Sequence, residues 1–252
     1  MKIQYCSDLH LEFKENKSFL NQHPIEPIGE ILILAGDIVP FKVMDKYADF
    51  FSYVSDHFKT TFWIPGNHEY YYFDAATKSG ALNEKIKSNV HLVNNLAVCI
   101  DTIRFVFSIL WTNIPPAHQW QIQRGMSDFQ VINYGGHPFF TSNYNQLHTE
   151  CLSFLKLELE KTVVTKNVVV THHVPTFMNY PQKYRGDALN DAFAVELYDL
   201  IETHGPDYWI YGHTHSNTAD FEIGKTQLLT NQLGYVKYGE NENFNKKALF
   251  NI

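Results

Sequence analysis

The residues of this sequence that could bind a metal ion or transfer a proton fall into five short groups. Six of the 13 histidines belong to these groups, together with two aspartates and one asparagine. Imidazole, carboxylate and amide groups together suit divalent Mn, Fe, Zn or Co better than Ca²⁺ or Mg²⁺, which prefer oxygen ligands. The groups are Asp8 with His10, Asp37, Asn67 with His68, His172 with His173, and His213 with His215.

Each group directly follows a segment with the pattern of a β-strand. The run Ile31–Ala35 is apolar throughout, as expected for a strand buried on both faces of a parallel sheet. Asp8, Asp37 and Asn67 recur at intervals of about 30 residues, which matches consecutive βαβ units. Since sites form at the carboxyl ends of such strands, these three residues are expected to meet at one sheet edge. The five strands are Lys2–Cys6, Ile31–Ala35, Thr60–Ile64, Asn167–Thr171 and Asp207–Tyr211.

The rest of the chain predicts further helices and strands in one domain spanning residues 1–252. Two short strands are expected within Val98–Leu110, around a turn near Asp101, and Thr218–Ile223 with Gln227–Thr230 indicates a closing hairpin. Segments rich in Pro, Gly, Gln and Asn predict long, partly irregular excursions at Trp111–Phe140 and Val174–Asn190. Helices are expected at Asp45–His57, Ala81–Ser88, Ser142–Lys161 and Asp191–Thr203.

Composition narrows the class of protein. Apolar residues make up 44% of the 252 residues, which suits a globular core and argues against disorder. The net charge of −7 argues against tight nucleic-acid binding, and no apolar run is long enough for a membrane span. The three cysteines are few and unclustered, so we expect no disulfide framework and a reducing, cytoplasmic location. The sequence does not predict an oligomeric state.

The spacing within the groups favours two metal ions. Asp-x-His and His-x-His place alternate side chains on the same side of an extended strand end. Asp37 stands alone between the other groups, so its carboxylate could bridge both ions. Gly36 and Gly66 precede candidate ligands and would let the backbone turn sharply there. A single histidine at a strand end is usually solvated or structural, but five groups in succession favour a metal centre.

The five groups, taken in order, resemble the motifs of the calcineurin-like metallophosphoesterases over residues 5–218. The motifs are Asp8-Leu-His10, Gly36-Asp37, Gly66-Asn67-His68-Glu69, His172 and Gly212-His213-Thr-His215. The resemblance implies an α/β fold, specifically a four-layer α/β-β/α sandwich with a dinuclear centre at the strand ends between the sheets.

The resemblance also implies residue roles. His172 is preferred to His173 as a ligand because family members with one histidine here place it directly after the strand. His68 would lie beside the leaving group or phosphate without binding metal. The implied ligands are Asp8, His10, Asp37 and His215 for one ion, and Asp37, Asn67, His172 and His213 for the other.

The implied activity is metal-dependent hydrolysis of a phosphoric ester, as a phosphatase or phosphodiesterase. Two ions, Mn²⁺, Fe²⁺/Fe³⁺ or Zn²⁺, would supply a bridging hydroxide for in-line attack, with Asp37 and His68 as the catalytic residues. A small-molecule or nucleotide phosphomonoester or phosphodiester is the first substrate class, and a Ser/Thr phosphoprotein is the second. A non-catalytic metal-bound interaction scaffold is a third reading, disfavoured because every ligand position and His68 are present.

Four further residues are expected near the substrate. Trp111 and Asn113 follow the strand Arg104–Leu110, and His173 follows the candidate ligand His172. Arg185 lies in the second irregular excursion and is a candidate phosphate contact. Core packing for the aromatic residues and a surface loop for Arg185 are the alternatives.

Overall fold

The strands that precede Asp8, Asp37 and Asn67 lie side by side in the first of two six-stranded sheets. The computed structural model describes residues 1–161 and 166–252. In the first sheet β1, β2, β3 and β5 run parallel, and an antiparallel strand closes each edge. Its order is β14 (Leu249–Asn251), β1 (Lys2–Cys6), β2 (Ile31–Ala35), β3 (Thr60–Ile64), β5 (Val90–Asn94) and β4 (Leu82–Lys87).

The second sheet carries the two histidine groups. Its strands β7, β10, β11 and β13 run parallel, with antiparallel strands at both edges. Its order is β12 (Phe221–Ile223), β13 (Thr226–Thr230), β11 (Tyr208–Tyr211), β10 (Lys166–Thr171), β7 (Ile103–Ser108) and β6 (Leu96–Ile100). A separate two-stranded ribbon joins β8 (Asn133–Tyr134) and β9 (His137–Pro138).

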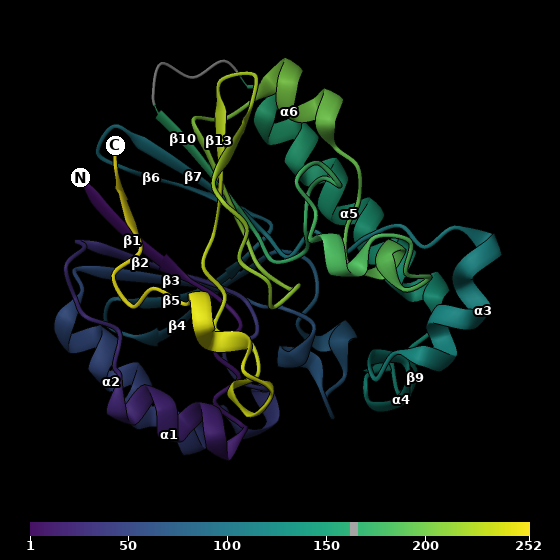
Figure 1. Cartoon of the computed structure of the whole chain (residues 1–252), viewed down its shortest axis with the longest axis horizontal. Coiled ribbons are helices and arrows are strands. Elements are labelled where there is room, and N and C mark those ends of the chain that lie inside the picture. The colour runs from purple at the N-terminus through teal and green to yellow at the C-terminus, as the bar shows by residue number, and fades with distance from the viewer. Residues whose placement is uncertain (162–165) are drawn as a thin grey trace.

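Helices cover the outer face of each sheet, so the chain forms four layers (Figure 1). Helices α1 (Lys14–Gln22) and α2 (Ala48–His57) pack on the first sheet, and α5 (Thr141–Leu159) and α6 (Tyr198–His204) pack on the second. The strand β2 is apolar throughout because its alternate residues are buried on opposite faces of the sheet. Ile33 faces the core between the sheets, whereas Leu34 faces the core under α1 and α2. The expected four-layer α/β-β/α fold is confirmed.

Two of the helix predictions are wrong. Ala81–Ser88 contains the edge strand β4, which pairs with β5 and has an irregularity between Lys85 and Lys87. Leu82 and Ile86 are four residues apart, a spacing that fits a helix as well as an alternating strand. Within Asp191–Thr203 only α6 is α-helical, because the segment before it pairs with Val174 through Phe193 and Val195 instead. Tertiary pairing therefore overrides the local pattern in both places.

The expected helix Ser142–Lys161 is confirmed as α5, whereas the other expected helix begins differently. The expected helix Asp45–His57 starts as the 3-10 turn Phe41–Tyr47 and becomes α-helical at Ala48. The excursion Trp111–Phe140 contains α3 (Pro116–Gly125), α4 (Asp128–Val131) and the β8–β9 ribbon. Among the described residues, no helix combines the length and apolar character needed to cross a membrane.

Candidate metal centre

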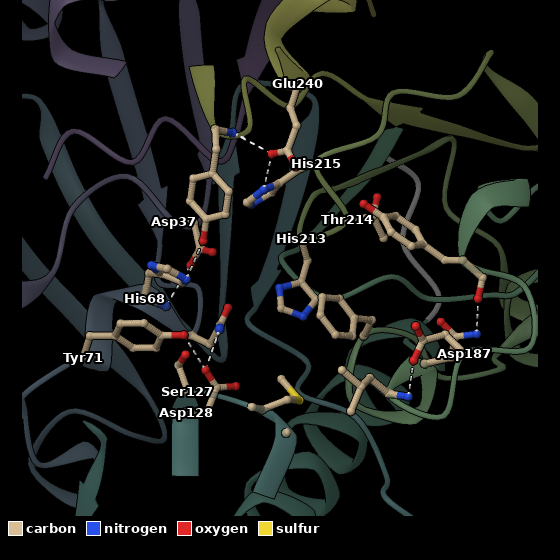
Figure 2. A pocket seen from close by; sticks show the side chains of 18 of the residues that line it. Asp37, His68, Tyr71, Ser127, Asp128, Asp187, His213, Thr214, His215 and Glu240 are labelled. Atoms are coloured by element: carbon tan, nitrogen blue, oxygen red, sulfur yellow. Dashed lines mark hydrogen bonds and ion pairs between the residues drawn. The ribbon is translucent and has the colours of Figure 1, made fainter. Parts of the chain in front are cut away.

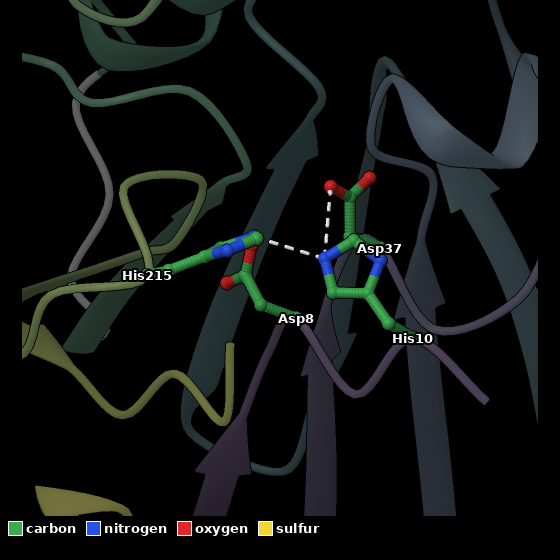
Figure 3. Close-up of side chains that lie close together, drawn as sticks. All are labelled: Asp8, His10, Asp37 and His215. Atoms are coloured by element: carbon green, nitrogen blue, oxygen red, sulfur yellow. Dashed lines mark hydrogen bonds and ion pairs between the residues drawn. The ribbon is translucent and has the colours of Figure 1, made fainter. Parts of the chain in front are cut away.

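The five groups of candidate ligands meet where strands of both sheets end. The first sheet brings the ends of β1, β2 and β3 together, and the second brings those of β10 and β11. Asp8, His10 and Asp37 follow strands of the first sheet, whereas His215 follows β11 of the second. Figure 3 shows these four side chains pointing toward one another across the gap between the sheets.

The first donor set consists of Asp8, His10, Asp37 and His215, whose ligand atoms all lie within 4.8 Å of one another. His10 Nε2 lies 2.9 Å from His215 Nε2 and 3.7 Å from Asp37 Oδ2. His215 Nε2 lies 3.4 Å from Asp8 Oδ1. Two imidazole nitrogens and two carboxylates thus converge on one small, buried volume.

The second donor set shares Asp37 with the first. His172 Nε2 lies 3.4 Å from Asp37 Oδ1, 3.0 Å from His213 Nδ1 and 3.3 Å from Asn67 Oδ1. Asp37, His172 and His213 form a second cluster of candidate ligands. The two Asp37 oxygens therefore face different donor sets, Oδ2 toward His10 and Oδ1 toward His172.

The hydrogen bonds around the second set fit a cation. His172 Nδ1 donates to the carbonyl oxygen of Ala35 at 3.0 Å, so in the neutral ring Nε2 presents a lone pair to oxygens and another nitrogen. His213 Nε2 is buried and has no hydrogen-bond partner among the described residues. Burial opposes a charge on His172, yet the Asp37 carboxylate raises its pKa to about 9. The surroundings thus favour a positive charge at this point.

The pKa shifts of Asp37 and His213 match the protonation states that metal ligands need. Burial opposes ionisation of Asp37, but the imidazoles of His172 and His68 outweigh it and hold the pKa of Asp37 well below its usual range. Burial, followed by the neighbouring His173 and His172, keeps the pKa of His213 well below its usual value. A carboxylate that stays ionised and an imidazole that stays neutral are both able to bind metal.

Backbone strain is concentrated at these residues. Asp8, His10 and Asp37 have φ angles of 56°, 44° and 55°, and His213 and His215 have 79° and 49°. A non-glycine residue in this left-handed region costs free energy and persists only when the surrounding structure enforces it. Strain at five candidate ligands indicates that their placement is maintained against local preference.

Glu69 joins two of the loops that carry candidate ligands. Its fully buried carboxylate accepts hydrogen bonds from the backbone N–H of Asp37 at 2.9 Å and of Gly66 at 2.6 Å. It also accepts from the N–H of Ile38 and the indole of Trp63. Glu69 therefore fixes the loop after β2 against the loop after β3.

Two glutamate carboxylates lie within hydrogen-bond distance of Nδ1 on two candidate ligand histidines. Glu12 Oε1 lies 3.3 Å from Nδ1 of His10, and Glu240 Oε2 lies 2.8 Å from Nδ1 of His215. An Nδ1–H that donates to a carboxylate leaves Nε2 free to bind a metal, which is the usual arrangement around metal-binding histidines. Sequence analysis missed both glutamates. The Asp-x-His-x-Glu spacing could have indicated Glu12, but no local pattern marks Glu240.

His68 lies beside the centre and faces the adjoining cavity. Its Nδ1 lies 3.3 Å from Glu12, its Nε2 lies 3.2 Å from the Tyr235 hydroxyl, and its ring stacks on Tyr71 at 4.0 Å. Burial lowers its pKa, but the carboxylates of Asp37 and Glu12 outweigh burial, so the pKa of His68 is raised. His68 is thus held as a hydrogen-bond donor at the cavity wall.

Asp128 orients the amide of Asn67. It accepts hydrogen bonds from Asn67 Nδ2 and from the Tyr71 hydroxyl, both at 2.9 Å. This leaves Asn67 Oδ1 facing His172 and the second donor set. The sequence offered no signal for Asp128, because it lies in an excursion that was expected to be irregular.

A cavity of about 340 Å³ opens from the centre. Figure 2 shows His68, Tyr71 and Asp128 on one side of it, with Asp187 across from them and His213 between. Its further lining comes from Gly125–Asp128 in the first excursion and from residues 180–193 in and after the second. Both excursions therefore shape the approach to the candidate metal centre.

The four expected substrate contacts are placed elsewhere. His173 is fully buried, with Nδ1 against the carbonyl of Ile109 and Nε2 against the Tyr144 hydroxyl. Trp111 is buried beside Tyr144. Both therefore pack in the core, and neither lines this cavity.

Asn113 and Arg185 are exposed but do not line this cavity. Asn113 lines a different surface pocket with residues of α5 and α6. Arg185 immediately follows Tyr184, which does line the cavity. None of the four expected substrate contacts is therefore among the residues that line the cavity.

Comparison with known families identifies the chain. The model of the calcineurin-like phosphoesterase family matches residues 1–217. The chain belongs to this family. The Acanthamoeba polyphaga mimivirus protein named "Uncharacterized protein L509" is 32% identical, over 99% of this chain and 96% of its own length.

Solved structures share the fold of this calcineurin-like phosphoesterase. The Mycobacterium tuberculosis phosphopantetheinyl hydrolase matches 99% of the chain and 95% of its own, with a TM-score of 0.71 and 15% identity. A dimetal phosphatase from Danio rerio matches 92% of the chain and 87% of its own, with a TM-score of 0.50 and 13% identity. At these identities the likeness shows the fold alone.

Proposed function

We propose that this calcineurin-like phosphoesterase uses two metal ions to hydrolyse a phosphomonoester or phosphodiester of a small molecule or nucleotide. The observation that carries the proposal is the position of Asp37, whose two carboxylate oxygens face two separate donor sets. A buried carboxylate shared in this way suits a pair of ions better than one ion.

The proposed ligands divide between the two sets. Because the donors mix imidazole, carboxylate and amide oxygen, Mn²⁺, Fe²⁺/Fe³⁺ or Zn²⁺ suits them. A bound pair of such ions acidifies water and neutralises phosphate oxygens. The ligands are Asp8, His10, Asp37 and His215 for one ion, and Asp37, Asn67, His172 and His213 for the other.

His68 is the proposed proton donor to the leaving oxygen. It lines the cavity but belongs to neither proposed ligand set, and Glu12 and Tyr235 hold its two ring nitrogens. Glu12, as acceptor, keeps a proton on Nδ1, while Nε2 is the nitrogen on the Tyr235 side. The ring can thus meet a bound ester without reorienting.

The cavity favours a small ester over a protein substrate. Its volume of about 340 Å³ is near the lower end of small-molecule sites. A cytoplasmic location is proposed with it, on the ground of the few, unclustered cysteines of the sequence.

The test is metal analysis and ester hydrolysis by the purified full chain. With Mn²⁺ added, the protein should bind two ions and cleave 4-nitrophenyl phosphate or its bis ester. Asp37→Asn should lose metal and activity together, while His68→Ala should keep both ions and lose about 10²–10⁴-fold in rate. Asp56→Asn, on the exposed face of α2, is the matched control and should behave as wild type. Two bound ions without turnover of either ester would contradict the enzyme and favour a metal-bound scaffold.

A further inference from the structure

One wall of the cavity is apolar and aromatic. It combines side chains from the two excursions with Phe193, whose ring stacks on His213 at 4.5 Å. Its phenol rings both lie in the second excursion, and Tyr180 is held there by a hydrogen bond to Asn190. The members of this wall are Met126, Tyr180, Tyr184, Leu189 and Phe193.

Contact between the two excursions maintains this wall. Gly125 and Leu189 approach so closely that a Cβ on Gly125 would lie 3.2 Å from Leu189 Cδ2. Leu189 is also fixed locally, because its backbone N–H donates to Asp187 Oδ1 at 2.8 Å. The apolar wall is therefore a built surface and does not depend on a single loose side chain.

Apart from Asp37 and the histidines, the ionisable acidic and basic side chains in the described lining are carboxylates and tyrosines. Asp128, Asp187 and Glu240 line the cavity together with the candidate ligands, and no lysine or arginine is among its described lining residues. Three cations lie outside the lining: Arg124 packs on the ring of Trp120 at 4.9 Å, Lys183 lies over Tyr184 at 4.6 Å and interacts electrostatically with Glu240, and exposed Arg185 follows Tyr184 in the chain. Within the described lining, a second phosphate on a substrate would therefore meet carboxylates and no lysine or arginine.

We propose that this cavity selects phosphate esters whose organic group is planar or apolar and carries no second phosphate. The inference rests on the proposed phosphoesterase activity and specifies its substrate class. The ester phosphate lies at the metal centre beside His68, and the organic group packs against Tyr184, Leu189 and their neighbours. Nucleoside polyphosphates and multiply phosphorylated peptides are disfavoured by the same surface.

Three esters with similar alkyl leaving groups test the selection. They are ethyl phosphate, benzyl phosphate and the bisphosphate of 1,4-benzenedimethanol, assayed with the metal-loaded full chain. We expect kcat/KM for benzyl phosphate to exceed that for ethyl phosphate about tenfold, from burial of the ring. We expect the bisphosphate to fall about tenfold below benzyl phosphate. Equal values for ethyl and benzyl phosphate, or a preference for the bisphosphate, would overturn the proposal.

Two variants locate the effect. Tyr184→Ser should reduce the benzyl-to-ethyl ratio mainly through KM, and Asp187→Lys should raise kcat/KM for the bisphosphate. Tyr198→Ser, in α6 and outside this cavity, is the aromatic control and should keep both ratios. Unchanged ratios in Tyr184→Ser and Asp187→Lys would also overturn the proposal, because selection would then arise elsewhere.

A binding measurement separates the two levels of inference. Calorimetry with benzylphosphonate and ethylphosphonate, which lack the cleavable ester bond, reports cavity selection without turnover. Tighter binding of benzylphosphonate with no hydrolysis of any ester would contradict the proposed function but support the preference of the cavity for an aromatic group. Hydrolysis of all three esters with equal binding of the two phosphonates would support the proposed function and contradict the preference for an aromatic group.

Discussion

The carboxylate of Glu12 lies 3.3 Å from Nδ1 of His68, although 56 residues separate them in the chain. The same Glu12 oxygen lies 3.3 Å from Nδ1 of His10. One carboxylate therefore orients a proposed metal ligand and the proposed proton donor together.

Replacing Glu12 should impair both neighbours. We expect Glu12→Gln to lower metal affinity or kcat/KM by about 10–100-fold, the usual effect of losing a carboxylate behind a ligand histidine. Titration with Mn²⁺ and steady-state kinetics on 4-nitrophenyl phosphate would measure the two effects separately. Glu15→Gln, at an exposed position of α1 three residues further along the chain, is the control. Wild-type values of both parameters in Glu12→Gln would show that this carboxylate orients neither ring.

Glu240 should affect one ion more than the other. It contacts only His215 among the proposed ligands, at 2.8 Å, and His215 belongs to the first donor set. We expect Glu240→Gln to weaken one of two binding steps about 10–100-fold and leave the other near its original value. Isothermal titration with Mn²⁺ would resolve the steps. Equal weakening of both would contradict the division of ligands into two sets.

Glu69 should matter chiefly for stability. Its carboxylate accepts five hydrogen bonds from buried donors of the described residues, and Glu69→Gln replaces one accepting oxygen by an amide that cannot accept. Leaving a buried donor unpaired costs about 1–3 kcal/mol, so the free energy of unfolding should fall by that order. Chemical denaturation would measure it, with exposed Glu15→Gln as a control of the same type. A loss of activity without loss of stability would contradict this role.

Asp74 should give the β8–β9 ribbon a stability that depends on pH. Its carboxylate accepts from the backbone N–H groups of Ala76, Gly135 and Gly136. Burial opposes the shift, but these bonds lower the pKa of Asp74 in the folded protein. The stabilisation is therefore complete above the unfolded value of about 3.9 and is lost as pH falls through the lower folded pKa.

The measurement for Asp74 compares wild type with Asp74→Asn across pH. Thermal unfolding should show a higher Tm for wild type at pH 6, with the difference shrinking below about pH 4. Amide exchange at Gly135 and Gly136 would localise the effect to the ribbon. A Tm difference that stays constant down to pH 2 would show that the ionised Asp74 carboxylate does not stabilise the ribbon.

The convergence of the candidate ligands was predictable because it depends on strand ends. Continuous apolar runs mark buried parallel strands, so the positions of Asp37 and His172 relative to the sheets followed from the sequence pattern. The strand β4 was not predictable, because spacing by four residues suits two kinds of element and only its pairing with β5 decides. Glu240 and Asp128 could not be foreseen either, since long-range packing alone brings them to His215 and Asn67.

The origin of the ligands in both sheets has a consequence for unfolding. Each donor set takes side chains from loops of the first sheet and from loops of the second, with Asp37 opposite His172 in one and opposite His215 in the other. Ions bound there would connect the two sheets of the sandwich. Ion binding would therefore increase the free energy of unfolding. At a free ion concentration 100 times the Kd, such linkage contributes about 2.7 kcal/mol per site. Chelators should then act on this protein as denaturants do, by making the separation of the sheets less costly.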